Sequence, residues 1–142
     1  KQKKEINSST SAEIIKNRKI KSFLKTTELI AIIASVIPPK FQHARIHFAT
    51  RTFQALRIAV NDELGNLQKF LPEAMDVLAS GGRLAVISFH SLEDRIVKKF
   101  FREQIKSEQG EILTKKPIIA GEAEVQINSR SRSAKLRVFK KA

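Results

Sequence analysis

Hydrophobic residues in the first half of the chain recur at helical spacing. Residues 29–37 present apolar side chains over a wide face, Thr26 or Thr27 can cap the start of that helix, and two prolines end it. A longer helix is predicted from Thr50, because apolar residues then recur in steps of three and four, at Phe53, Leu56, Val60, Leu64 and Leu67. Such a stripe is typical of a helix face packed against a core.

Other residues mark where these helices begin and end. Pro72 lacks an amide proton, so we expect it to interrupt the longer helix and to open a short one over residues 73–79. Residues 1–12 are polar and have no periodicity, which predicts a disordered start. A short basic helix is predicted over residues 13–22.

The sharpest local pattern is the apolar run over residues 83–89, which predicts a strand buried on both faces of a sheet. Two glycines precede it, and a predicted capping box follows, in which Ser91 accepts from the amide of Asp94 and the Asp94 carboxylate reaches back. Apolar residues then share one face over 92–105. The order helix, strand, helix predicts an α/β fold with a doubly wound sheet, to which residues 112–119 and 134–139 add weaker strands on either side of a polar turn.

The charge balance changes the picture of what the chain binds. Its 142 residues carry 27 Lys and Arg against 14 Asp and Glu, a formal net charge of +13. Residues 51–100 are almost neutral, with seven basic and six acidic groups, so the excess lies towards the two ends. This balance favours a polyanionic partner such as nucleic acid over an acidic protein surface.

Several classes of site are disfavoured by what the sequence lacks. There is no cysteine, which excludes disulfides and thiolate ligands, and we expect no metal site. The five glycines form neither a dinucleotide fingerprint nor a P-loop, so no cofactor-binding residue is predicted in this chain. The apolar stretch 29–37 is far shorter than the ~20 residues of a membrane span, so no membrane partner is expected.

One candidate site lies at the end of the apolar run. In open α/β sheets ligands bind beyond the carboxyl ends of strands, where His90 and Ser91 stand before a helix N-terminus. Two interpretations stay open: Ser91 and Asp94 cap the helix, and His90 is either a rim histidine or a substrate contact. The nucleophile elbow of hydrolases is absent, so we do not expect Ser88, His90 and Asp94 to form a hydrolytic triad.

A second candidate is the basic, serine-spaced stretch 128–137. Its cationic residues, Arg130, Arg132, Lys135 and Arg137, suit contacts to phosphates. The alternative is a solvated edge strand whose charges oppose aggregation. Arg51 and Arg57 share a stripe of the helix after Thr50 and are further candidates for phosphate contacts.

Residues 47–63 (HFATRTFQALRIAVNDE), 81–102 (GGRLAVISFHSLEDRIVKKFFR) and 128–137 (NSRSRSAKLR) together resemble the MraW/RsmH family, the bacterial 16S rRNA cytosine-N4 methyltransferases. The resemblance implies S-adenosylmethionine as cofactor, a cytidine in the decoding region of the small ribosomal subunit as target, and a cytoplasmic location. It also implies that residues 1–46 are the end of an α-helical insert domain and residues 47–142 the C-terminal half of a Rossmann-like methyltransferase domain.

On this resemblance, His90, Ser91 and Asp94 are expected at the rim of the substrate pocket, and Arg51, Arg57, Arg130, Arg132 and Arg137 are expected to bind RNA. The cofactor-binding half would lie outside this chain, so we expect the chain alone to be inactive and to expose apolar surface along 83–89, with self-association or a homodimer as the result. A catalytically silent RNA-binding or ribosome-associating remnant is the alternative, followed by an unrelated basic α/β binding module.

Overall fold

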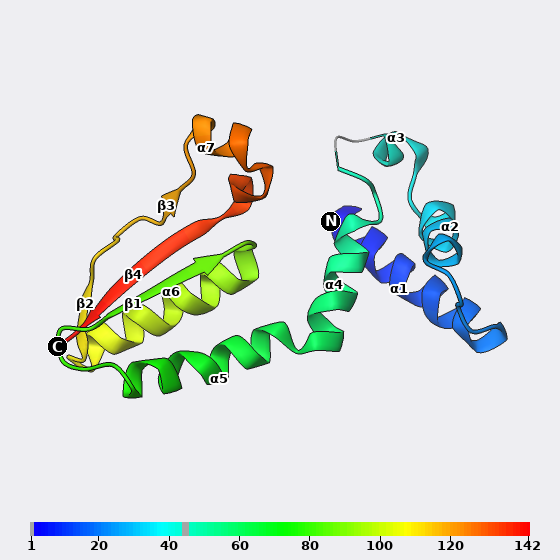
Figure 1. Cartoon of the computed structure of the whole chain (residues 1–142). Helices are drawn as coiled ribbons and strands as arrows, with labels where there is room; N and C mark the ends of the chain where they lie inside the picture. The colour runs from blue at the N-terminus through cyan, green and yellow to red at the C-terminus, as the bar shows by residue number, and fades with distance from the viewer. Residues whose placement is uncertain (1, 44–45) are drawn as a thin grey trace. The chain divides into compact units, whose positions relative to one another are not determined.

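The computed structural model describes the backbone of residues 2–43 and 46–142, with side chains from Ser8 onward within those ranges (Figure 1). The chain divides into two compact units, one up to Val60 and one from Asn61 to Ala142. Each unit has its own hydrophobic cluster, so each is described by itself.

The first unit is helical, with α1 (Gln2–Ile20), α2 (Thr26–Val36), α3 (Pro39–Gln42) and α4, which begins at Thr50 and runs to Asn61. Its core is centred on Leu29, Ile33 and Ala49, with half-buried aromatic residues packed around them. The predicted disordered start is wrong for residues 2–12, which form the beginning of α1. Their missing apolar stripe does not prevent a helix, because the turns that follow pack against α2.

Neither Thr26 nor Thr27 caps α2, contrary to the sequence prediction. The N-cap is Lys25, and the carboxylate of Glu28 reaches back: its Oε2 accepts from the Leu24 amide at 2.7 Å and the Lys25 amide at 3.1 Å. These two backbone hydrogen bonds, with Lys21 beside them, lower the pKa of Glu28. Glu28, the third residue of the helix, therefore makes the side-chain hydrogen bonds at the start of α2 that were expected from a threonine.

The second unit opens with α5 (Glu63–Asp76), which runs through Pro72 without a break. The predicted interruption there is wrong, because Leu71, Ala74 and Met75 beside it are buried and their packing holds the helix. The break falls earlier, at Asp62, whose φ of 46° is left-handed. The Asp62 carboxylate lies directly over Gly65, where a Cβ atom would overlap it.

The sheet of the second unit consists of β1 (Arg83–Ser88), β2 (Gly110–Ile112), β3 (Ile118–Ile119) and β4 (Lys135–Lys141). β4 lies between β1 on one side and β2 and β3 on the other, and each of these described pairings is antiparallel. The predicted α/β fold is confirmed, but these pairings are antiparallel, and the doubly wound arrangement of the sheet stays a prediction. β1 and β2 do run in the same direction, and α6 (Ser91–Lys106) connects them, but the last strand enters between them reversed.

Two other segments differ from their predicted form. The predicted strand over 112–119 is two short strands, and the predicted acidic turn is helix α7 (Glu122–Ile127), followed by the 3₁₀ helix η1 (Ser129–Ser133). Thr114 Oγ1 accepts from the Val138 amide at 2.9 Å between β2 and β3, so a side chain replaces a ladder bond there.

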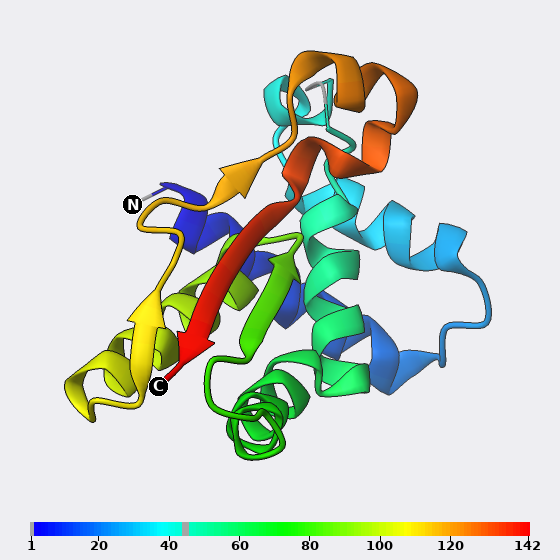
Figure 2. The same cartoon turned by 60° about the vertical axis from the view of Figure 1, so that its left-hand side comes forward.

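One face of the sheet is covered by α6, which lies behind the strands in Figure 2, and α5 packs against α6. Leu84 and Phe139 point from the strands into this core, where they meet Val97 and Phe101. β1 is not buried on both faces as predicted: Ile87 is 57% and Phe89 54% exposed, because strand side chains alternate and the described residues of this unit cover one face. Leu56 and Val60 are also exposed, since the break at Asp62 divides their stripe between the two units.

Candidate nucleic-acid and base site

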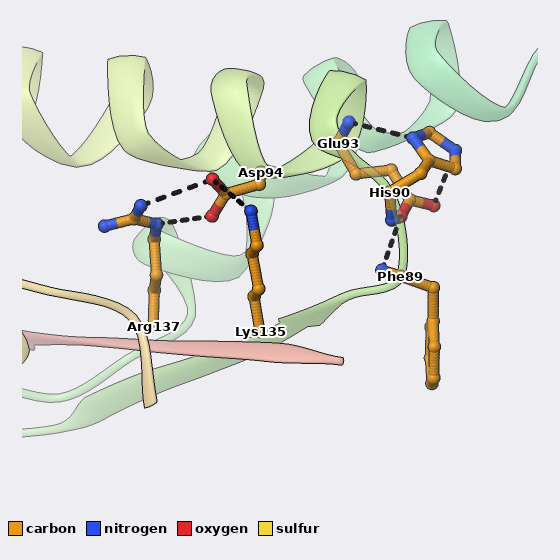
Figure 3. A network of polar contacts seen from close by, with 6 residues as sticks. All are labelled: Phe89, His90, Glu93, Asp94, Lys135 and Arg137. Atoms are coloured by element: carbon orange, nitrogen blue, oxygen red, sulfur yellow. Dashed lines mark hydrogen bonds and ion pairs between the residues drawn. The ribbon is translucent and has the colours of Figure 1, made fainter. Parts of the chain in front are cut away.

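The junction between β1 and α6 is built by His90 and Glu93 (Figure 3). His90 is the N-cap, and its Nδ1 accepts from the Glu93 amide at 3.3 Å. Glu93 Oε2 accepts in return from the Phe89 amide at 2.8 Å and the His90 amide at 3.2 Å. The cap therefore lies one residue before the predicted one, and Ser91 is an exposed first helical residue instead of the N-cap.

Two atoms of this cap face away from the backbone. His90 Nε2 is buried, has no hydrogen-bond partner and lies 3.4 Å from Glu93 Oε1, with 10% of the His90 side chain exposed. Ligand atoms of Glu63, His90 and Glu93 lie within 4.8 Å of one another. Sequence reasoning missed Glu63 and Glu93. The spacing from histidine to glutamate three residues on was a readable signal for Glu93, whereas nothing near Glu63 indicates its place.

Asp94 faces the sheet and not the cap. Its carboxylate accepts from Arg137 Nε at 2.7 Å and Nη2 at 3.3 Å, and Lys135 Nζ lies 3.8 Å away (Figure 3). The hydrogen bonds from Arg137 and the charges of Arg137 and Lys135 lower the pKa of Asp94, although partial burial opposes this. The predicted reach of Asp94 to the helix start is wrong, because Glu93 already occupies those amides.

The basic cluster divides once it is folded. Arg130 and Arg132 are exposed on η1, whose start is held by Asn128: its Oδ1 accepts from the Arg130 amide at 3.2 Å and its backbone oxygen accepts from Ser131 Oγ. Arg137 is buried and hydrogen-bonded to Asp94, so it does not present its guanidinium to a phosphate. Arg51 and Arg57 are exposed on α4, in the other unit.

The glycines of the described residues do not form a glycine-rich cradle for a cofactor. Gly81, with φ of 77°, and Gly82 make the turn before β1, and Gly110 lies against the Lys140 carbonyl in the sheet. Gly121 follows β3 as the N-cap of α7, but it is a lone glycine before a six-residue helix, so these residues do not fit an S-adenosylmethionine site.

A hollow of about 430 Å³ lies at the opposite end of β4 from His90, between Ile105, Gly110 and Lys141. Since β4 pairs with β1 from Lys135 opposite Ser88 to Lys140 opposite Arg83, this hollow is separated from the candidate site by the length of the strand. Among the described residues, no helix is long and apolar enough to cross a membrane.

Comparison with known proteins gives one consistent result. The model of the MraW methylase family matches residues 2–142. The chain is 60% identical over 119 residues to a Trichormus variabilis protein named ribosomal RNA small subunit methyltransferase H, covering 84% of this chain and 38% of the relative. Proteins of the same name from Synechocystis and Heliobacterium mobile are 61% and 52% identical over 81% and 92% of this chain. The chain spans less than half the length of each of these relatives.

Proposed function

Because the chain belongs to the MraW methylase family, we propose that it forms the base-binding and RNA-binding part of an S-adenosylmethionine-dependent rRNA methyltransferase. The proposed reaction is N4-methylation of a cytidine in the decoding region of 16S rRNA. The observation that carries the proposal is the match of the family model over residues 2–142, together with relatives at 52–61% identity. The cofactor would supply the methyl group, and residues outside this chain would hold the cofactor.

The fold supports this assignment for the second unit. β1 leads into a helix N-terminus with a half-buried histidine and two half-buried carboxylates, the kind of polar group that holds a base presented outside a helix stack. Residues 47–142 would then belong to the methyltransferase domain and residues 1–46 to a helical insert. The exposed Ile87 and Phe89 would lie against further parts of that domain or against a second copy of the chain.

Exposed cations supply the RNA-binding part of the proposal. Arg130 and Arg132 stand on a short 3₁₀ helix with serines between them, and Arg51 and Arg57 are exposed on α4. Arginines contact phosphates through two donors, which fixes the position of an RNA without reading its sequence. Arg137 was also expected in this set, but it is left out because its guanidinium donates hydrogen bonds to the Asp94 carboxylate.

This predicts a change in salt dependence. Replacing Arg130 and Arg132 together by alanine removes two phosphate contacts, so the slope of log affinity against log salt should flatten by about two units for every RNA tested. Fluorescence anisotropy of the chain with 16S rRNA fragments at several salt concentrations measures this slope.

A charge-matched control is Arg102→Ala with Lys106→Ala, two exposed cations of α6, which should leave the slope near that of the parent. An equal flattening of the slope in the control would show that the change comes from the lower net charge and not from contacts of Arg130 and Arg132. A loss confined to one RNA sequence would show that Arg130 and Arg132 read bases.

The activity is tested in a chimera in which this chain replaces the matching segment of the Trichormus variabilis relative. Transfer of labelled methyl groups to small ribosomal subunits, with the modified nucleoside identified by mass spectrometry, is the expected result. A folded chimera that binds ribosomal RNA but transfers no methyl group would favour the second candidate, a catalytically silent RNA-binding remnant.

A further inference from the structure

Positive charge gathers where α1 ends and a loop leads into α2 (Figure 1). Residues 14–27 contain no acidic residue and five cationic ones, Lys16, Arg18, Lys19, Lys21 and Lys25. Lys16 Nζ lies 3.7 Å from Glu13 Oε1, and Lys21 Nζ lies 3.2 Å from Glu28 Oε1. Among the side chains that the structure describes, no carboxylate pairs with the three other cations, which are all exposed.

Apolar side chains of the same segment are divided between the core and solvent. Phe23 is half-buried and packs against the hydrophobic cluster of the first unit. Ile20 and Leu24, on either side of it in sequence, are 78% and 81% exposed. A single exposed leucine is ordinary, but here two large apolar side chains stand among three cations. We call this set the loop surface, and its members are Arg18, Lys19, Ile20, Leu24 and Lys25.

The backbone of the loop is held in place before any ligand binds. The Lys21 amide donates to the Asn17 carbonyl at 3.0 Å, so the last turn of α1 is closed. At the other end, Glu28 Oε2 accepts from the amides of Leu24 and Lys25 at 2.7 and 3.1 Å. With Phe23 packed on the core as well, a partner would pay little conformational entropy to order this loop.

We propose that the loop surface binds single-stranded RNA, with its cations at phosphates and its two apolar side chains against the faces of unpaired bases. The proposal rests on the proposed function and adds to it a second RNA-binding surface, in the helical unit, besides Arg130 and Arg132 in the second unit. Cations supply contacts to phosphate that do not depend on sequence. The apolar pair favours unpaired RNA, because the base faces of a duplex are covered by stacking and those of a single strand are accessible.

The first test concerns the cations and uses this chain with a labelled single-stranded RNA. Replacing Arg18 and Lys19 together by alanine should flatten the slope of log affinity against log salt by about 1.4 units and weaken binding about tenfold at physiological salt. Fluorescence anisotropy over a range of salt concentrations measures both. The matched control is again Arg102→Ala with Lys106→Ala, one exposed arginine and one exposed lysine of another helix, which should keep the parent slope.

The second test concerns the apolar side chains. Leu24→Ser removes apolar contact without changing charge, so affinity for the single-stranded RNA should fall about fivefold at an unchanged salt slope. Affinity for the same RNA annealed to its complement should not change. The control is Val77→Ser, at a residue of the second unit that is 85% exposed, and it should leave both affinities as in the parent.

The outcomes separate this inference from the proposed function. An unchanged slope in the Arg18 and Lys19 variant, with the expected flattening in the Arg130 and Arg132 variant, would overturn the inference and leave the proposed function standing. An equal loss for single-stranded and duplex RNA in Leu24→Ser would overturn the contact with unpaired bases. A folded parent chimera that transfers no methyl group would overturn the proposed function, whereas the affinities of this chain would still decide the inference.

The remaining alternative is a lipid surface, since exposed apolar side chains among cations also suit an anionic membrane. Sedimentation of the chain with phosphatidylglycerol vesicles measures this. We expect no binding that depends on Leu24. Vesicle binding that is lost in Leu24→Ser, with RNA affinity unchanged in that variant, would overturn the proposal and assign the loop surface to a membrane.

Discussion

Two neighbouring acids in the first turn of α6 are used in opposite ways. Asp94 is tied to Arg137, 43 residues further along the chain, and so joins α6 to β4. Glu93 binds the amides of Phe89 and His90, four and three residues before it, and so holds only its own turn. Ligand atoms of Glu93, His90 and Glu63 also lie within 4.8 Å of one another. The comparison shows that Asp94 joins α6 to the sheet, whereas its neighbour Glu93 lines the candidate site.

The largest expected effect is on the Asp94 connection. Arg137→Met keeps a similar apolar volume but leaves Asp94 with Lys135 at 3.8 Å as its cationic neighbour, so the free energy of unfolding should fall by about 2–3 kcal/mol. Urea unfolding of the chain measures it. Arg132→Met, at an exposed position on η1, is the control and should change stability by less than about 0.5 kcal/mol. Equal losses in the two variants would show that Asp94 does not join the layers.

A smaller effect of the same contact should appear in acid. Arg137 lowers the pKa of Asp94 in the folded chain below its ordinary value of 3.8, so the unfolded chain takes up the proton first as pH falls. The stabilisation is present above the unfolded pKa and is lost as pH falls through the folded pKa. Unfolding curves from pH 7 to pH 2 should therefore be less steep for Asp94→Asn than for the parent. Asp76→Asn, at an exposed position, should follow the parent curve.

The smallest effects distinguish the local cap. His90→Ala removes the acceptor of the Glu93 amide and should cost about 1 kcal/mol of unfolding free energy. Ser91→Ala should cost less than about 0.5 kcal/mol, because Ser91 is exposed and is not the cap. Thermal unfolding of both variants compares them. A larger loss of stability in Ser91→Ala than in His90→Ala would show that Ser91 is the N-cap, as the sequence pattern indicated.

The main elements of the second unit were predictable because their signals are local. The apolar run over 83–89 is β1 with one added residue, and the helix predicted after it is α6. The cap was misassigned by one residue because serine is the commoner capping residue and histidine is rarely considered for that place. The family resemblance was confirmed, since it rests on long motifs that folding does not alter.

The direction and facing of β4 could not be predicted from its sequence. Alternation along 135–141 suggests that Leu136 and Val138 point inward, but its pairing with β1 places Phe139 opposite Leu84 and Arg137 opposite Val86, on the face that α6 covers. A buried arginine reverses the hydrophobic pattern, and its partner Asp94 is distant in sequence. Glu63 was missed for the same reason, since only the fold brings it to His90.

The left-handed residue between α4 and α5 has a consequence for how this sequence can evolve. Position 62 admits few residues, chiefly glycine, asparagine and aspartate, because others are strained at a φ of 46°. The Asp62 carboxylate in turn lies over Gly65, so a side chain added at 65 would force that carboxylate to move. A change of Asp62 to glycine removes this neighbour, so the order of substitutions matters: alanine at 65 should cost less stability after aspartate is lost at 62 than before. The two positions should therefore vary together among descendants of this sequence, as an epistatic pair.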